Sequence, residues 1–174
     1  PATQTALHAA ACIGARFELD LLARISGQGP AAALASLWLA VQAGLVRPLG
    51  DAYKFLGDEQ RGGEFEFVHD RIQQAAYALG APAERAEIHL RIGRLLQAQG
   101  DVLASDERLF ELVNHFSEGA ALIHEATERA AVLKLAIEAG RRAKAAAAHA
   151  AAADYYQTGI ELLAQQAGHD EHEL

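Results

Sequence analysis

A histidine and an aspartate, His69 and Asp70, stand at a predicted junction between a strand and a helix. Phe65 and Phe67 would share one face of the strand, because successive side chains alternate between the two faces. Asp70 followed by Gln73 has the spacing of a capping box, which would start the helix and leave its first N–H groups free. Such N–H groups favour anions. The pattern therefore predicts that His69 and the helix start together contact a phosphate group.

The strand and the helix beside this pair are expected to be anchored in one core. The helix would bury an apolar stripe made of Ile72, Ala75, Ala76 and Leu79. Upstream, apolar side chains at helical spacing predict three helices, which end near Gly14, Gly27 and Gly44. Strand-like runs are expected at 46–49, 53–56 and 65–68, with a polar, Gly-rich tip at 57–63. Three helices followed by a two-stranded β-hairpin wing predict a winged-helix domain over residues 1–80.

Residues 81–166 predict an antiparallel array of helices, so the fold class is expected to be mainly α. Pro82 and Glu84 would begin one helix, Ser105 would cap the next, and a long helix would start near Thr127. Over about 133–166, one tetratricopeptide-like repeat is predicted by the offsets of its small and aromatic positions, Gly140, Ala147, Ala152, Tyr156 and Gly159. One repeat cannot bury its own face, so we expect further repeats in a longer parent protein. Residues 167–174 are expected to be a frayed tail.

The charges argue against nucleic acid as a partner. The chain carries 15 Lys and Arg against 23 Asp and Glu, a net charge of −8, and a negative surface repels phosphate backbones. Residues 101–174 hold most of the excess, with 13 acidic and 6 basic side chains. A DNA-binding winged helix reads bases with polar side chains of its third helix, and here that helix has no basic residue. Arg47, Lys54 and Arg61 on the wing are more typical of a solvated surface.

Other residues of reactive type have structural interpretations. Cys12, the only cysteine, lies in an Ala-rich helix and is expected to be a buried packing residue. His169 and His172 have metal-like spacing but lie in the expected tail, so no metal site is predicted. The remaining histidines are expected at interfaces or in solvent: His89, His115, His124 and His149. For His69, the alternative to phosphate sensing is a hydrogen bond to a backbone carbonyl between wing and helix.

Some activities and locations are disfavoured by what the sequence lacks. No apolar run reaches the roughly 18 to 20 residues that span a bilayer, and no secretory signal opens the chain. We therefore expect a cytoplasmic protein that does not contact membranes. The chain contains no Met, which favours an internal segment of a larger protein. It also lacks the Gly-x-x-x-x-Gly-Lys-Ser/Thr loop, so it is expected neither to hydrolyse ATP nor to hold a cofactor by itself.

The sequence resembles the signal-transduction ATPases with numerous domains (STAND ATPases), whose winged-helix domain carries a Met-His-Asp signature. Val68, His69 and Asp70 occupy those three positions, and Val68 replaces the usual Met with another apolar side chain. The resemblance is closer to large bacterial kinases in which such an ATPase lies between a Ser/Thr-kinase-like domain and a sensor histidine kinase. It follows the chain in order through these segments: 10–17, 37–45, 51–55, 69–77, 89–96, 113–115 and 139–145.

The resemblance implies that His69 contacts the β-phosphate of ADP bound to the parent ATPase and locks a closed, inactive state. On this reading the segment is non-catalytic. Its partners are the nucleotide-binding domain of the same chain and, on the helical array, a possible protein; ADP or ATP belongs to the parent. The competing interpretation is a protein–protein interaction scaffold with an inert winged helix, and a DNA-binding regulator is a third.

Overall fold

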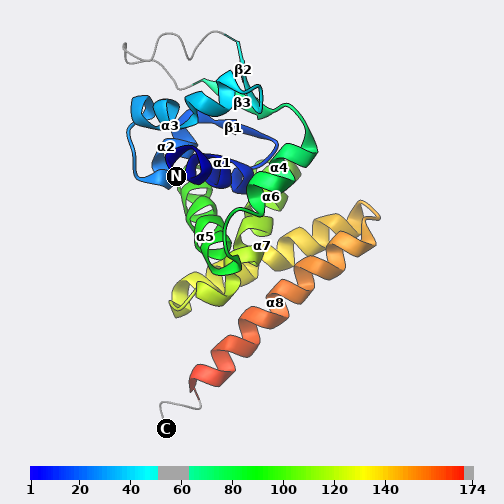
Figure 1. Ribbon diagram of the computed structural model, residues 1–174. Helices are drawn as coiled ribbons and strands as arrows, with labels where there is room; N and C mark the ends of the chain where they lie inside the picture. Colours follow the sequence, from blue (N-terminus) through cyan, green and yellow to red (C-terminus); the bar gives the residue numbers. More distant parts are fainter. Residues whose placement is uncertain (51–62, 171–174) are drawn as a thin grey trace. The chain divides into compact units, whose positions relative to one another are not determined.

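The computed structural model describes residues 1–50 and 63–170, except for the side chains of 166–170. The described chain is mainly helical and has one small antiparallel sheet (Figure 1), which confirms the expected class. It divides into two compact units, Pro1–Ile88 and His89–Leu174; the predicted domain boundary after residue 80 stays a prediction. Within the described ranges, no helix is both long and apolar enough to cross a bilayer.

The first unit alternates helices with short strands. Its elements are α1 (Ala2–Ile13), β1 (Arg16–Glu18), α2 (Leu19–Ser26), α3 (Pro30–Gln42), β2 (Val46–Leu49), β3 (Glu64–Phe67), α4 (Asp70–Tyr77) and the start of α5 (Pro82–Ala98). The expected helix ends are confirmed. Gly27 and Gly44 follow α2 and α3 with left-handed backbones, φ 65° and 68°, a conformation that costs glycine little.

The sheet has three strands in the order β1-β3-β2, so β3 is the central strand. Phe17 of β1 lies opposite Phe65, and Arg47 of β2 lies opposite Glu66. The third strand, β1, was not expected, because Phe17 was placed in a turn; the two-stranded hairpin wing stays a prediction. The Phe17 ring stacks on Phe65 at 5.9 Å, and this contact holds residues 16–18 against the free edge of β3. The expected strand at 53–56 and nearly all of the 57–63 tip lie outside the described residues.

The turn between α4 and α5 is packed against α1 through a glycine. A Cβ at Gly80 would fall 2.0 Å from Cε1 of His8, whose side chain is buried. Arg85 fixes the same turn, since its guanidinium donates to the Gly80 carbonyl oxygen at 2.7 Å and lies 4.9 Å from the centre of the Tyr77 ring. Close packing, rather than an unusual φ, therefore requires glycine at residue 80.

The second unit is a set of helices. After the end of α5 come α6 (Asp106–Gly119), the short 3-10 helix η2 (Ala120–Leu122), α7 (Ala126–Ala145) and α8 (His149–Asp170). The predicted cap of α6 is confirmed, because Ser105 Oγ accepts a hydrogen bond from the Arg108 N–H at 3.2 Å. The apolar face predicted for this helix is buried: Leu109, Leu112, Val113 and Phe116. α8 reaches Asp170 and so extends into the segment expected to fray.

Helices α7 and α8 form a hairpin, joined by a short turn (Figure 1). Gly140 and Gly159 stand where the helices approach each other closely. A Cβ at Gly140 would fall 2.5 Å from the Tyr156 ring, and one at Gly159 would fall 3.3 Å from Leu133 Cδ1. The small positions that predicted a tetratricopeptide-like repeat thus lie at a helix–helix contact, while the assignment of the hairpin to that repeat class stays a prediction.

A buried histidine pair joins α5 to α6. His89 and His115 were expected at interfaces or in solvent; both are buried where α5 meets α6, and their Nδ1 atoms are 2.8 Å apart, a contact that was not expected. One ring must donate and the other accept, so the accepting ring is neutral. Burial, with a smaller effect of His89, lowers the pKa of His115 to about 4. His124 and His149 are exposed, as expected.

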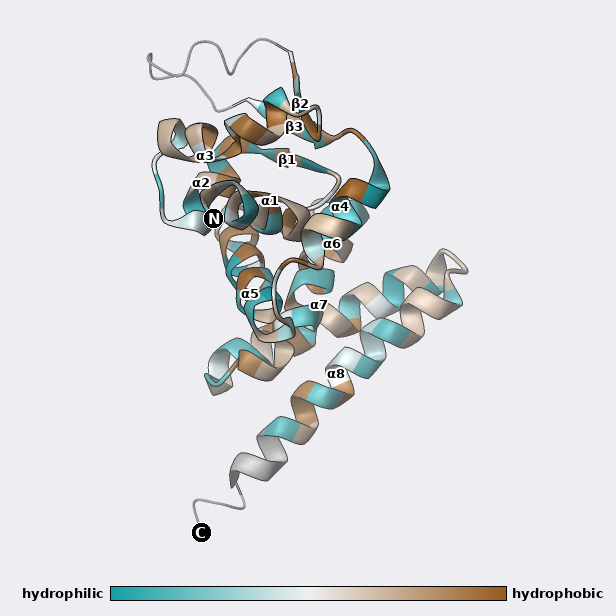
Figure 2. Ribbon diagram, in the orientation of Figure 1, coloured by the Kyte–Doolittle hydropathy of each residue, from teal (hydrophilic) through white to brown (hydrophobic). Residues whose placement is uncertain are grey.

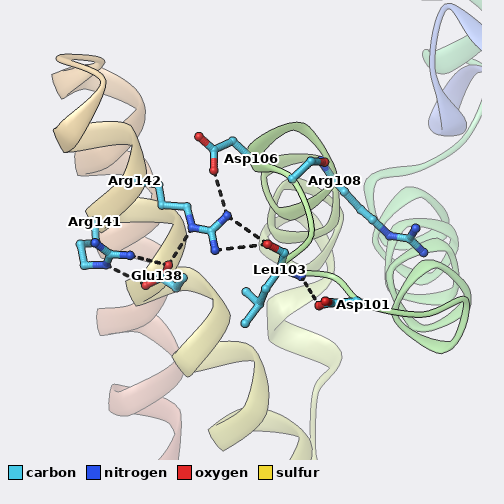
Figure 3. Close-up of polar contacts among 8 residues, drawn as sticks. Asp101, Leu103, Asp106, Arg108, Glu138, Arg141 and Arg142 are labelled. Carbon is cyan, nitrogen blue, oxygen red and sulfur yellow. Dashed lines mark hydrogen bonds and ion pairs between the residues drawn. The ribbon is translucent and has the colours of Figure 1, made fainter.

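An arginine ties the loop before α6 to α7 (Figure 3). Arg142 donates to Glu138 Oε1 at 2.7 Å on its own helix, to Asp106 Oδ1 at 2.9 Å, and to the Leu103 carbonyl oxygen at 3.3 Å. Hydrogen bonds from Arg141 and then Arg142 lower the pKa of Glu138 to about 2. Among these residues, Arg141 bonds only to Glu138 of its own helix, whereas Arg142 connects α7 to Leu103 and Asp106.

The first prediction concerns the contact between Gly80 and His8. Gly80→Ala should destabilise the first unit by about 1 to 3 kcal/mol, because the new methyl group overlaps a buried ring. In a His8→Ala background the same change should cost much less, since the ring is gone. Urea denaturation of the four proteins of this cycle measures the coupling. Equal costs of Gly80→Ala in both backgrounds would contradict the packing that we describe.

The second prediction is a pH dependence of the second unit. His115 is neutral in the folded state near and above pH 5, but in the unfolded chain it takes up a proton below about pH 6.5. Its contribution to stability is therefore complete above about pH 6.5 and is lost as the pH falls towards 4, on the order of 3 kcal/mol in total. Urea midpoints across this range, assigned to α6 by amide exchange, measure it. His115→Gln should flatten the dependence, and His124→Gln, at an exposed position, should leave it intact.

The third prediction separates the two arginines of α7. Arg142→Ala should speed amide hydrogen exchange in the loop at 101–105 and lower the thermal midpoint, because it removes bonds to both Leu103 and Asp106. Arg141→Ala is the matched control, with the same change one residue earlier, and it should affect neither quantity measurably. If the two variants behaved alike, Arg142 would not be the link between this loop and α7.

Candidate functional site

The candidate site is the junction between β3 and α4. His69 precedes α4 as its N-cap residue, in an extended conformation with φ −147° and ψ 144°. Its carbonyl oxygen accepts the N–H of Ile72 at 2.9 Å and that of Gln73 at 3.3 Å, and these are the first bonds of the helix. The side chains of His69 and Asp70 are both exposed. The junction thus presents an imidazole and a carboxylate to solvent at a helix start.

The capping box predicted for this junction was wrong. The helix is capped by His69 rather than Asp70, and no side chain makes the cap hydrogen bond. Gln73 does not reach back to the helix start, because its side-chain amide donates to the Ala11 carbonyl oxygen of α1 at 3.3 Å. Asp70 lies in the first turn, where its charge is favourable to the helix dipole. The first N–H groups of α4 consequently receive no side-chain cap.

Only one side of α4 packs against the rest of the first unit. The residues on that side are not all the ones that the sequence predicted. Ala76 is buried and Ile72 is half-buried, as expected, whereas Ala75 and Leu79 are exposed. Gln73 supplies part of the inward face through its bond to α1. A polar residue took the place of an apolar one because a backbone carbonyl at the end of α1 was available to it.

The strand that leads to the site is held from both sides by charges. Glu66 of β3 is 8% exposed. Arg16 of β1 donates to it at 3.0 Å, and Arg47 of β2 pairs with its other oxygen. The hydrogen bond from Arg47 is the main cause of a lowered pKa of Glu66, with a further contribution from Arg16. These ion pairs cross the sheet in register and fix the strand from which His69 emerges.

The outward face of α3 is apolar. Trp38 is 41% and Leu39 is 64% exposed, and the helix carries no charged residue. Its colours are accordingly mostly on the hydrophobic side of the scale (Figure 2). A helix that is apolar all round is normally covered by protein. The candidate DNA-reading helix thus exposes apolar side chains and has no charged residue that could contact bases. Of the wing residues Arg47, Lys54 and Arg61, the last two lie outside the described residues.

A buried Cys–His contact was missed from the sequence. Cys12 is buried, as expected, and its Sγ lies 3.8 Å from Nε2 of His8 one turn earlier on α1. Burial lowers the pKa of His8, an effect that Glu84 opposes and Arg85 reinforces. The i, i+4 spacing in an Ala-rich helix was the available signal. Because both side chains are buried, the pair fits packing better than attack on a substrate.

In the described chain, no group of three or more His, Cys, Asp or Glu side chains could hold a metal ion. His169 lies in α8, in the part whose side chains are not described, and His172 lies outside the described residues. The metal-like spacing in this tail therefore stays without a structural counterpart.

Comparison with known proteins gives one informative similarity. No family model matches the chain, and no solved structure matches it. It is similar to hybrid signal transduction histidine kinase G of Dictyostelium discoideum, with 27% identity over 201 aligned positions. The alignment covers 92% of this chain and 6% of the length of that protein. The chain is therefore similar, over nearly its whole length, to a small part of a much longer signalling kinase.

Proposed function

We propose that this chain is a non-catalytic regulatory segment of a larger signalling protein, in which the first unit senses a nucleotide and the second relays its state. The weak similarity to a signal transduction histidine kinase supports a signalling-related role. The residues of the β3–α4 junction and the exposed faces of the nearby helices support nucleotide sensing.

The order of elements in the first unit supports a winged-helix assignment. Three helices precede the last two strands, and the first short strand pairs beside β3. In such a domain the third helix is the usual reader of DNA, but α3 exposes Trp38 and Leu39 and has no cation. We therefore assign α3 to a protein contact. In this proposal, the contact is with the nucleotide-binding domain of the parent chain.

The exposed pair at the start of α4, His69 and Asp70, is the main support for nucleotide sensing. His69 is exposed and directly precedes backbone N–H groups that have no intrahelical acceptor. These donors match the oxygen atoms of a terminal phosphate, and the dipole of α4 favours its charge. ADP and ATP differ in which phosphate is terminal, so a fixed donor set can have different affinities for the two states, as a switch requires.

The second unit would relay the nucleotide state or hold a partner protein. Its helical hairpin supports a tetratricopeptide-like sensor, with Gly140 and Gly159 at the helix contact. The alternative is a protein–protein interaction scaffold in which the winged helix is inert. The apolar face of α3 fits both functions, whereas the exposed His69 favours the sensor.

The fourth prediction tests the sensor in the full-length protein. His69→Ala should weaken ADP binding roughly tenfold or more, because loss of a hydrogen bond to a charged group costs about 1.5 to 3 kcal/mol. It should also raise signalling output in the absence of a stimulus. Calorimetry with ADP and an output assay measure the two effects.

His124→Ala is the matched control, since His124 is also exposed but lies in the second unit; it should change neither quantity. Asp70→Ala should have a smaller effect on ADP affinity than His69→Ala, because an ionised carboxylate has no hydrogen-bond donor for a phosphate. Unchanged ADP affinity in a folded His69→Ala protein would contradict the sensor and leave the scaffold as the better account.

A further inference from the structure

Three side-chain contacts join the end of α4 to the start of α5. Glu84 Oε2 accepts a hydrogen bond from the Ala81 N–H at 2.9 Å, and the Arg85 guanidinium donates to the Gly80 carbonyl oxygen at 2.7 Å. Arg85 also lies over the ring of Tyr77, 4.9 Å from its centre, where the cation is attracted to the aromatic face. Tyr77 is the last residue of α4, so these contacts connect the two helices across their turn.

The helix that starts at the candidate site is itself lightly buried. Ala76 is the one buried residue among the eight of α4, whereas α1 and α2 bury seven and five residues. The hydrogen bond from the Gln73 amide to Ala11 of α1 is long, at 3.3 Å. Elements with few buried residues move most easily in a folded protein. We call residues 70–88, which comprise α4, the turn and the first part of α5, the α4–α5 corner.

The α4–α5 corner lies against α1 at its bend. Because Gly80 has no side chain, the bend approaches the buried ring of His8 closely, where a Cβ would fall 2.0 Å from it. Burial lowers the pKa of His8, and the charges of Glu84 and Arg85 act on it in opposite directions, so both lie near the same ring. A bare backbone against a buried ring is a point about which the corner can turn. A shift at the start of α4 would then become a rotation of α5.

Helix α5 belongs to both units. It is continuous from Pro82 to Ala98, and the division between the units falls after Ile88. Residues 83–92 contain neither glycine nor proline, so nothing in this stretch weakens the helix where it passes from one unit to the next.

The second part of α5 is tied to the second unit. His89 lies 2.8 Å from His115 of α6, measured between their Nδ1 atoms. Arg94 donates two hydrogen bonds to Glu128 of α7, at 2.7 and 2.8 Å. A displacement of α5 would therefore act on both α6 and α7.

We propose that the α4–α5 corner relays the nucleotide state of the β3–α4 junction into the second unit. This inference rests on the proposed function, since it needs a phosphate at the start of α4. The bound phosphate displaces the lightly buried α4, the contacts of Glu84 and Arg85 make α5 follow, and the continuous helix carries the displacement beyond Ile88. Loss of the phosphate reverses it. The relay thus gives the proposed sensor a route to its output.

A break in α5 tests the relay in the full-length protein. Glu87 is exposed in α5, just before the division between the units. Glu87→Pro removes a helical N–H and makes its ring clash with the preceding turn, so α5 should kink there. ADP should still bind and slow amide exchange at Asp70 and Arg71, but signalling output should no longer differ between ADP and a non-hydrolysable ATP analogue. Glu87→Ala is the matched control, because it removes the same side chain and keeps the helix; its output should follow the nucleotide as in the parent.

The outcomes separate the relay from the sensor. If Glu87→Pro binds ADP and its output still follows the nucleotide, the relay is overturned and the sensor stands. If the full-length parent binds no ADP, the proposed function fails, and the relay of a nucleotide state fails with it.

The joint between the two helices is testable without nucleotide, in the 174-residue protein. Arg85→Ala should speed amide exchange at Ala78 and Leu79, at the end of α4, because it removes the bond to the Gly80 carbonyl and the contact with Tyr77. Glu87→Ala should leave both amides unchanged. Exchange at Ala78 and Leu79 that is the same in Arg85→Ala and the parent would show that α4 and α5 are not joined, and would overturn the relay.

Discussion

The placement of β3 is the constraint on which the rest of the first unit depends. This strand is paired on both edges, by β1 and by β2. Its phenylalanines are buried on one side, and on the other side Glu66 is held by Arg16 and Arg47. A strand fixed on both edges and both faces has one direction of exit. That direction sets where His69 emerges and where α4 begins, so an exposed histidine stands on a rigid support. Rigid support is what a binding group needs if it is to distinguish two nucleotide states that differ by one phosphate.

The second unit depends instead on close approach of helix backbones. Glycines at 140 and 159 let α7 and α8 approach, and the apolar faces of α6 and α7 fill the space beside them. The polar contacts that stabilise this unit are either buried or connect two helical segments. His89 and His115 bond to each other inside it, and Arg142 joins the loop before α6 to α7. Packing of this kind leaves large apolar side chains of the hairpin exposed, among them Ile137 and Ile160.

Local patterns in the sequence predicted most helices, because their signals are local. The glycines that end helices, the Ser105 cap and the apolar face of α6 can each be recognised from residues within a few positions of each other. The strand at 16–18 was missed because it has no alternating pattern of its own; it forms only when Phe17 meets Phe65, a residue far along the chain. The His89–His115 pair was missed for the same reason. At the site, the sequence predicted the exposed pair of polar residues but assigned the cap wrongly, since the Ala11 carbonyl that captures Gln73 lies on another helix. Where a short segment could form more than one local structure, its contacts with distant segments decide which one forms.

In the proposed function, the start of α4 and His69 contact a nucleotide phosphate in the full-length protein. The most direct measurement is amide hydrogen exchange at Asp70 and Arg71 in that protein, with ADP, with a non-hydrolysable ATP analogue and without nucleotide. These N–H groups precede the first intrahelical donors, so they should exchange rapidly in the absence of ligand. Bound ADP should slow their exchange strongly and the ATP analogue should slow it less, while amides within α3 stay unchanged. Exchange at residues 70 and 71 that is the same in all three conditions, at nucleotide concentrations that saturate the protein, would contradict the account.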